Sequence, residues 1–86
     1  MAILQDLTEA LAKDVLDAQE ELGDDRFYEK VSKILLDASP TTQEAFMTAV
    51  RVILAERRAR KFLEGSLKAK RTGGAAPQAP RDSVGH

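Results

Sequence analysis

The chain has 86 residues, of which 43% are hydrophobic and 31% charged, and its formal net charge is −1. This length allows one small domain, and the single histidine, His86, together with the lack of cysteine excludes disulfides and Cys/His metal sites. The first residues lack the basic and apolar segments of a secretory signal, and no apolar stretch approaches the ~18 residues that cross a bilayer. We therefore expect a soluble cytoplasmic protein whose small core favours a second subunit.

Residues 3–22 are predicted to form an amphipathic helix. Their apolar and small residues are spaced three or four apart, as in a helix with one buried face. These residues are Leu4, Leu7, Leu11, Val15, Ala18 and Leu22. Acidic residues dominate the opposite face. Gly23 is expected to end the helix, and Asp24 and Asp25 are candidate caps for the next one.

A shorter second helix is predicted over residues 25–38. Its apolar side consists of Phe27, Val31, Ile34, Leu35 and Ala38, and Tyr28 flanks this side.

The third helix is predicted over residues 40–68. Its start has two alternative registers: Ser39 as the cap with Pro40 in the first turn, or a capping box between Thr41 and Glu44. No Pro or Gly interrupts the sequence before Gly65. Strong helix formers fill this range, so we expect a helix roughly 40 to 45 Å long.

This third helix is too long for the first two to cover, and its apolar residues spread over a broad surface. Such a surface is typical of a helix buried on more than one side. We predict an all-α fold in which a short helical hairpin packs on the long C-terminal helix and the chain forms a helical-bundle homodimer. The candidate protein interface consists of Tyr28, Val52, Ala55, Ala59, Phe62 and Leu63. The alternative is that Val52, Ala55 and Ala59 form the edge of one wide core stripe.

From residue 72 the sequence is rich in Gly, Pro, Ala and polar residues, with almost no large apolar side chain. Such a segment cannot offset the entropy cost of ordering. We therefore predict a helical domain of residues 1–71 and a disordered tail of residues 72–86.

Charge is divided by position along the chain. Residues 1–37 carry ten acids and four bases, whereas residues 50–71 carry eight bases and two acids. Several cations on one helix can bind phosphates, which makes the later bases a candidate anion or nucleic-acid contact. These residues are Arg57, Arg58, Arg60, Lys61, Lys68, Lys70 and Arg71. The pI of about 5.8 counts against nucleic acid as the main ligand, because dedicated binders are strongly basic.

The basic cluster has other interpretations. Cations complement the dipole at the end of a helix, and they can also pair with the acidic first helix within or between subunits, which would align the helices. A membrane-surface helix is disfavoured because Phe62, Leu63 and Leu67 form only a thin apolar side. A helix-turn-helix is disfavoured because Gln43 is the only good base reader at the start of the third helix. Pairing of the charged regions ranks first and phosphate binding second.

No residue pattern suggests catalysis. Acids such as Asp14 and Asp17 lie at helical spacing on a polar face, where solvent covers them, and Asp24 and Asp25 lack the pattern of a calcium loop. We therefore predict a protein without enzymatic activity, cofactor or bound metal. The expected function is that of a small regulatory or adaptor module, which acts through helix-mediated protein–protein interaction and self-association. The alternative is a nucleic-acid-associated accessory protein that contacts phosphates through the basic end of the third helix.

Overall fold

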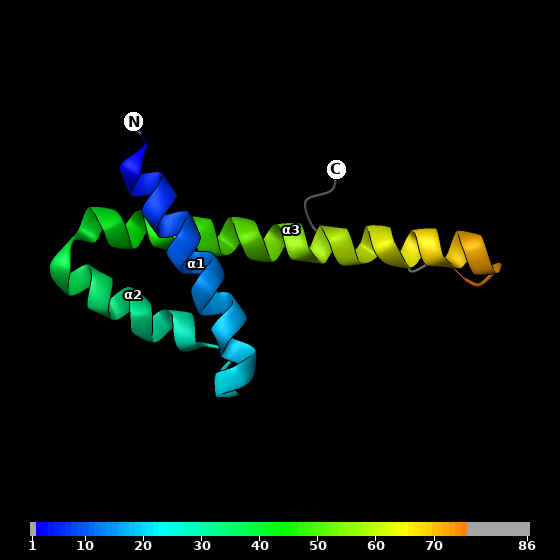
Figure 1. The fold of residues 1–86 in the computed structure, drawn as a ribbon, viewed down its shortest axis with the longest axis horizontal. Helices are drawn as coiled ribbons and strands as arrows, with labels where there is room; N and C mark the ends of the chain where they lie inside the picture. The colour runs from blue at the N-terminus through cyan, green and yellow to red at the C-terminus, as the bar shows by residue number, and fades with distance from the viewer. Residues whose placement is uncertain (1, 76–86) are drawn as a thin grey trace, which may run out of the picture. The chain divides into compact units, whose positions relative to one another are not determined.

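A computed structural model describes residues 2–75 of the chain. Within this range it contains three α-helices and no strand: α1 (Ile3–Leu22), α2 (Phe27–Ala38) and α3 (Pro40–Thr72) (Figure 1). The all-α class predicted from the sequence is confirmed for these residues. The chain divides into an N-terminal unit, Met1–Ala55, and a C-terminal unit, Glu56–His86, with the boundary inside α3.

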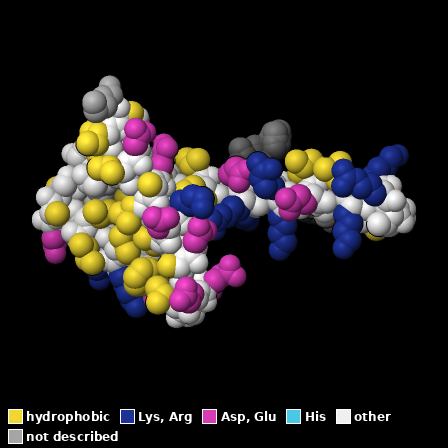
Figure 2. Space-filling model, in the orientation of Figure 1, with side chains coloured by type: hydrophobic (Ala, Val, Ile, Leu, Met, Phe, Trp, Pro, Cys, Tyr) yellow, Lys and Arg dark blue, Asp and Glu magenta, His cyan; other side chains and the backbone are white. Residues whose placement is uncertain are grey.

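The core of the N-terminal unit lies between α1 and the first half of α3. Its buried residues are Ala12, Val15 and Leu16 from α1 and Phe46, Ala49 and Val50 from α3. Within this unit α1 crosses α3 (Figure 1), and the largest fully buried side chains are Phe46, at 0% exposure, and Val50, at 1%. Hydrophobic side chains remain visible over the same unit (Figure 2). The core is therefore small and leaves much apolar surface uncovered.

The second helix covers one side of this core without entering it. None of its residues is fully buried. Four partly buried side chains pack against the core: Phe27, Tyr28, Val31 and Leu35. Gln43 Nε2 donates a hydrogen bond of 2.8 Å to Ser32 Oγ and so ties α3 to α2. The predicted packing of two short helices on the start of the third is present within this unit, and the predicted dimer stays a prediction.

The end of α1 is set by Gly23. This residue has φ 67° and ψ 32°, a left-handed conformation that glycine adopts without steric cost. The N–H groups of Gly23 and Asp24 donate to the carbonyl oxygens of Glu20 and Gln19 at 3.3 and 3.1 Å. Two of the last carbonyls of α1 are thus satisfied, and the helix ends at the residue predicted from the sequence.

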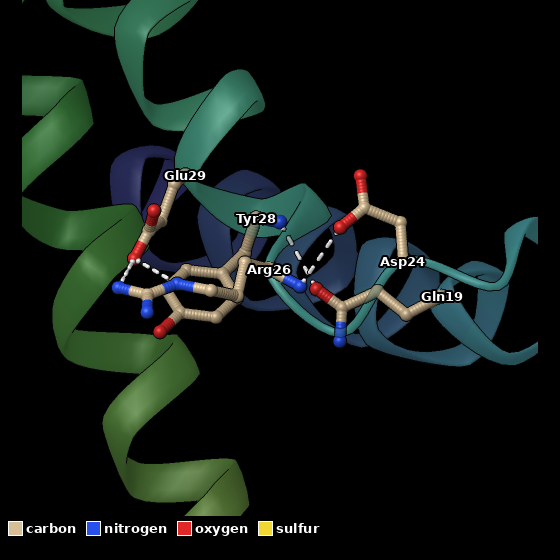
Figure 3. Close-up of polar contacts among 5 residues, drawn as sticks. All are labelled: Gln19, Asp24, Arg26, Tyr28 and Glu29. Carbon is tan, nitrogen blue, oxygen red and sulfur yellow. Dashed lines mark hydrogen bonds and ion pairs between the residues drawn. The ribbon is translucent and has the colours of Figure 1, made fainter.

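The start of α2 differs from the prediction by two residues. Asp24 Oδ1 accepts the N–H of Arg26 at 3.0 Å (Figure 3). The carbonyl of Asp24 accepts the N–H of Phe27 at 3.2 Å. This turn holds residues 24–26 outside the helix. The N–H of Tyr28 donates to Gln19 Oε1 at 3.0 Å, so a side chain of α1 satisfies a free donor in the first turn of α2.

The start of α3 uses the first of the two predicted registers. Ser39 Oγ accepts the N–H of Thr42 at 3.2 Å, and Pro40 is the first helical residue. The far end lies beyond the predicted residue 68, because the helix continues to Thr72 and stops before Gly73, which has φ 75°. Thr72 therefore belongs to the helix and not to the predicted tail. Residues 76–86 of that tail lie outside the described residues.

Candidate interaction surfaces

A groove lies between α1 and the first half of α3 in the N-terminal unit. Its volume is ≈ 690 Å³. The apolar part of its lining consists of Leu4, Ala45, Ala49, Val52 and Ile53, and the polar part of Gln5, Glu9, Lys13, Thr41, Glu44 and Thr48. Alanines in place of larger residues on α3 leave this space open beside the core. The arrangement of an apolar floor and a charged rim suits the apolar face of another helix.

The predicted interface residue Val52 lies in this groove. Its side chain is 62% exposed, so it contributes little to the core and is available for contact. Ala55, at the end of the same unit, is also exposed. Leu4, in contrast, was predicted to belong to the core stripe of the first helix, and its role in the groove is visible only once α1 is placed across α3.

A second groove of ≈ 480 Å³ lies between α2 and α3. It is lined by Tyr28, Glu29, Ser32, Lys33, Met47, Val50, Arg51 and Leu54. The predicted interface residue Tyr28 is half-buried here, on a different groove from Val52. The six predicted interface residues therefore do not form one surface. Met47 and Leu54 were missed, because helical spacing does not distinguish a groove wall from a core position.

Several leucines and isoleucines that were predicted as core residues are exposed. Leu7 of α1 is 63% exposed and Ile34 of α2 is 68% exposed. The buried row of α1 consists of Thr8, Ala12, Val15 and Leu16, of which only Val15 belongs to the predicted stripe. Small residues such as Thr8 and Ala12 let two crossing helices approach closely, so this row faces the core and Leu7 does not. The sequence prediction of the apolar stripe was wrong at these positions.

The C-terminal unit contains the other three predicted interface residues. Ala59, Phe62 and Leu63 are all exposed, Phe62 at 37% and Leu63 at 51%. Their spacing of three and four residues places them on one face of the helix. The helix thus has an apolar face of its own beside its basic residues.

The candidate phosphate-binding residues are exposed along this part of α3. They are Arg57, Arg58, Arg60, Lys61, Lys68, Lys70 and Arg71. Arg60 Nε donates to Glu56 Oε2 at 2.7 Å, one helical turn away, and this carboxylate raises the pKa of the Arg60 guanidinium. Glu64 adds a second acid to the row. The cluster therefore has a clear positive excess in which acids are interspersed.

The loop before α2 contains a compact group of charges. Lys30 Nζ lies 2.9 Å from Asp24 Oδ2, and Arg26 Nε donates to Glu29 Oε2 at 2.9 Å. The hydrogen bond from Lys30, followed by that from the Arg26 N–H, lowers the pKa of the Asp24 carboxyl. These contacts stabilise the turn between α1 and α2, and Figure 3 shows Asp24, Arg26 and Glu29 around it. They explain Asp24 as a structural residue.

Within residues 2–75, no three His, Cys, Asp or Glu side chains gather as a metal site would require. Over the same range, none of the helices is both long and apolar enough to span a bilayer. Gln43, the base reader considered from the sequence, has its side chain engaged with Ser32. Comparison with known proteins found no matching family model, curated protein or solved structure.

Proposed function

We propose that this chain is a small non-enzymatic regulatory or adaptor module that binds protein helices and associates with its own copies. The groove between α1 and α3 is the observation that carries the proposal. Its apolar floor, its charged rim and its volume of ≈ 690 Å³ suit the apolar face of an amphipathic helix.

The thin core of the N-terminal unit supports the same conclusion. Eight large hydrophobic residues of this unit are exposed, while its core cluster contains six buried residues, two of them alanines. Exposed apolar surface of this kind marks an interaction site more often than a monomer's free surface. A partner helix in the groove would bury part of this surface and stabilise the unit.

Site-specific photo-crosslinking tests the proposal in the full chain. A photoreactive amino acid replaces Val52 in the groove, and a matched variant carries it at Leu36, which is similarly exposed on α2 but lies outside the groove. We expect light-dependent protein adducts from position 52 and far fewer from position 36. Equal adduct formation at the two positions, or none at position 52, would reject the groove as the binding site.

A nucleic-acid accessory function is the second candidate. It is supported by seven exposed cations between residues 57 and 71. Neutralised phosphates release counterions, so this function requires an affinity that falls steeply with salt. A gel-shift titration with duplex DNA and single-stranded RNA at several salt concentrations measures it. Absence of binding at low salt would eliminate this candidate without affecting the first.

A further inference from the structure

We propose that the acidic outer face of α1 in one copy of this chain binds the second half of α3 in another copy, in a reciprocal two-fold dimer. The proposal rests on the self-association proposed above and names its surfaces, which are separate from the groove between α1 and α3.

The two helical segments have opposite net charges of equal magnitude. Helix α1 carries six acids and one lysine, a net charge of −5, whereas residues 56–72 carry seven bases and two acids, a net charge of +5. All of these side chains are exposed. Figure 2 shows acidic side chains over α1 and basic side chains over the second half of α3. One chain therefore contains both members of a complementary pair.

The outer face of α1 also carries apolar residues. Ile3, Leu7 and Ala10 are exposed and spaced four and three apart, and the same row continues through Asp14 and Glu21. The buried row that contains Ala12 and Val15 lies on the other side of the helix. The outer row is thus apolar in its first half and acidic in its second.

The second half of α3 matches this row in chemistry. Ala59, Phe62 and Ser66 are spaced three and four apart on one face of the helix, where Ala59 and Phe62 are exposed and Ser66 is half-buried. Arg58 lies one turn before Phe62, and Lys70 lies one turn after Ser66. Cations therefore flank an apolar strip, as binding to an acidic and apolar helix requires.

The charges also disfavour pairing of like helices between copies, whether α1 with α1 or the second half of α3 with its equivalent. Two second halves of α3 would bring charges of +5 together, and two α1 helices would bring charges of −5 together. Juxtaposed like charges are unfavourable and suppress wrong partners. Pairing α1 with α3 is the combination that the charges favour, and a two-fold axis makes it occur twice.

The surface area that each contact would bury supports a dimer with two equivalent contacts. A segment of this length is roughly 25 Å long and 10 Å wide, so one contact buries on the order of 500 Å² over both surfaces. Specific interfaces need about 1,000 Å² in total. Two equivalent contacts reach this value, and one contact does not.

A charge-swap experiment on the full chain tests the proposal. One variant carries Arg58→Glu and Lys70→Glu, and the other carries Asp14→Lys and Glu21→Lys. Sedimentation equilibrium should show a wild-type dimer whose Kd rises with salt, and a Kd raised roughly tenfold or more in each variant alone. An equimolar mixture of the two variants should regain affinity towards the wild-type value, because one contact of the mixed dimer is unchanged and in the other the introduced lysines meet the introduced glutamates.

A matched control carries Lys61→Glu and Lys68→Glu, which make the same charge change on the far side of α3. We expect its Kd to lie within about threefold of wild type, because these residues are outside the contact. Circular dichroism checks that each variant remains helical. A variant that has unfolded is thereby distinguished from a folded variant that no longer dimerises.

Three outcomes would overturn the proposal. The first is a monomeric wild type at low salt, including one that binds acidic vesicles or DNA through the same cations. The second is dimerisation of both charge variants with wild-type affinity. The third is a mixture that fails to restore the dimer. Crosslinks from position 52 in any of these cases would preserve the proposed helix-binding function and reject only this dimer.

Discussion

Single residues decide where the helices of this chain begin and end. Gly23 ends α1 through its positive φ, and Ser39 starts α3 by accepting a hydrogen bond from the Thr42 N–H at Ser39 Oγ. Both roles follow from local chemistry that acts over fewer than five residues. Asp24 has a different role, because its side chain accepts the N–H of Arg26 in a turn, so that α2 begins only at Phe27.

Replacement of Ser39 by alanine removes the cap of α3. We expect Ser39→Ala to lower the free energy of unfolding by about 1 kcal/mol, because the Thr42 N–H loses its acceptor. Urea unfolding followed by circular dichroism measures this loss. Thr41→Ala is the control, since Thr41 would be the cap in the alternative register. A larger loss for Thr41→Ala than for Ser39→Ala would contradict the observed cap.

The pKa of the Asp24 carboxyl is expected to lie below the usual aspartate value, chiefly because Lys30 donates a hydrogen bond to it. A lowered pKa means that the folded chain favours the charged form. The resulting stabilisation is complete above the pKa of the unfolded chain, about 3.9, and is lost as pH falls through the lower folded-state pKa. NMR titration of the Asp24 side chain measures its pKa in the folded chain. Lys30→Met should raise this pKa, and an unchanged value would show that Lys30 is not its cause.

At the scale of the element, helical periodicity located the helices but identified their buried faces only in part, since Val15 of the predicted stripe is buried whereas Leu7 is exposed. α1 buries a row of small and medium residues, Thr8, Ala12, Val15 and Leu16, where it crosses α3. α2 buries no residue fully, although its apolar side is as regular as that of α1. Burial depends on the angle and distance between helices, which one helix does not determine.

The difference between core and surface positions predicts unequal effects of two alanine substitutions. Phe46 is fully buried, so Phe46→Ala should lower the free energy of unfolding by about 3 to 5 kcal/mol, enough to unfold a unit with so small a core. Ile34 is 68% exposed, so Ile34→Ala should change the free energy of unfolding by no more than about 0.5 kcal/mol. Thermal unfolding followed by circular dichroism compares the two variants. A comparable loss in both variants would mean that Ile34 is covered in solution, as by a partner.

At the scale of the whole molecule, the division of charge between residues 1–37 and residues 50–71 is the main feature that packing within the N-terminal unit does not explain. The pairs formed by Lys13 with Asp17 and by Arg60 with Glu56 join neighbours on one helix. Such exposed pairs contribute about 0 to 1 kcal/mol each and leave the net charge of each region unchanged. We therefore expect the charge to act between molecules, and the charge-swap experiment tests this at the same scale.

The sequence by itself determined the all-α class, the approximate positions of the three helices and the end of α1 at Gly23, because these depend on residues close together in the chain. It also located Val52 as a candidate contact residue. Only the tertiary structure decided that Leu7 and Leu22 of α1 are exposed, that Tyr28 and Val52 lie in separate grooves, and that an apolar groove opens beside Ala45 and Ala49. The physical reason is that a groove is made by two helices at a particular crossing, and side-chain size at that crossing determines which residues approach closely and which face solvent.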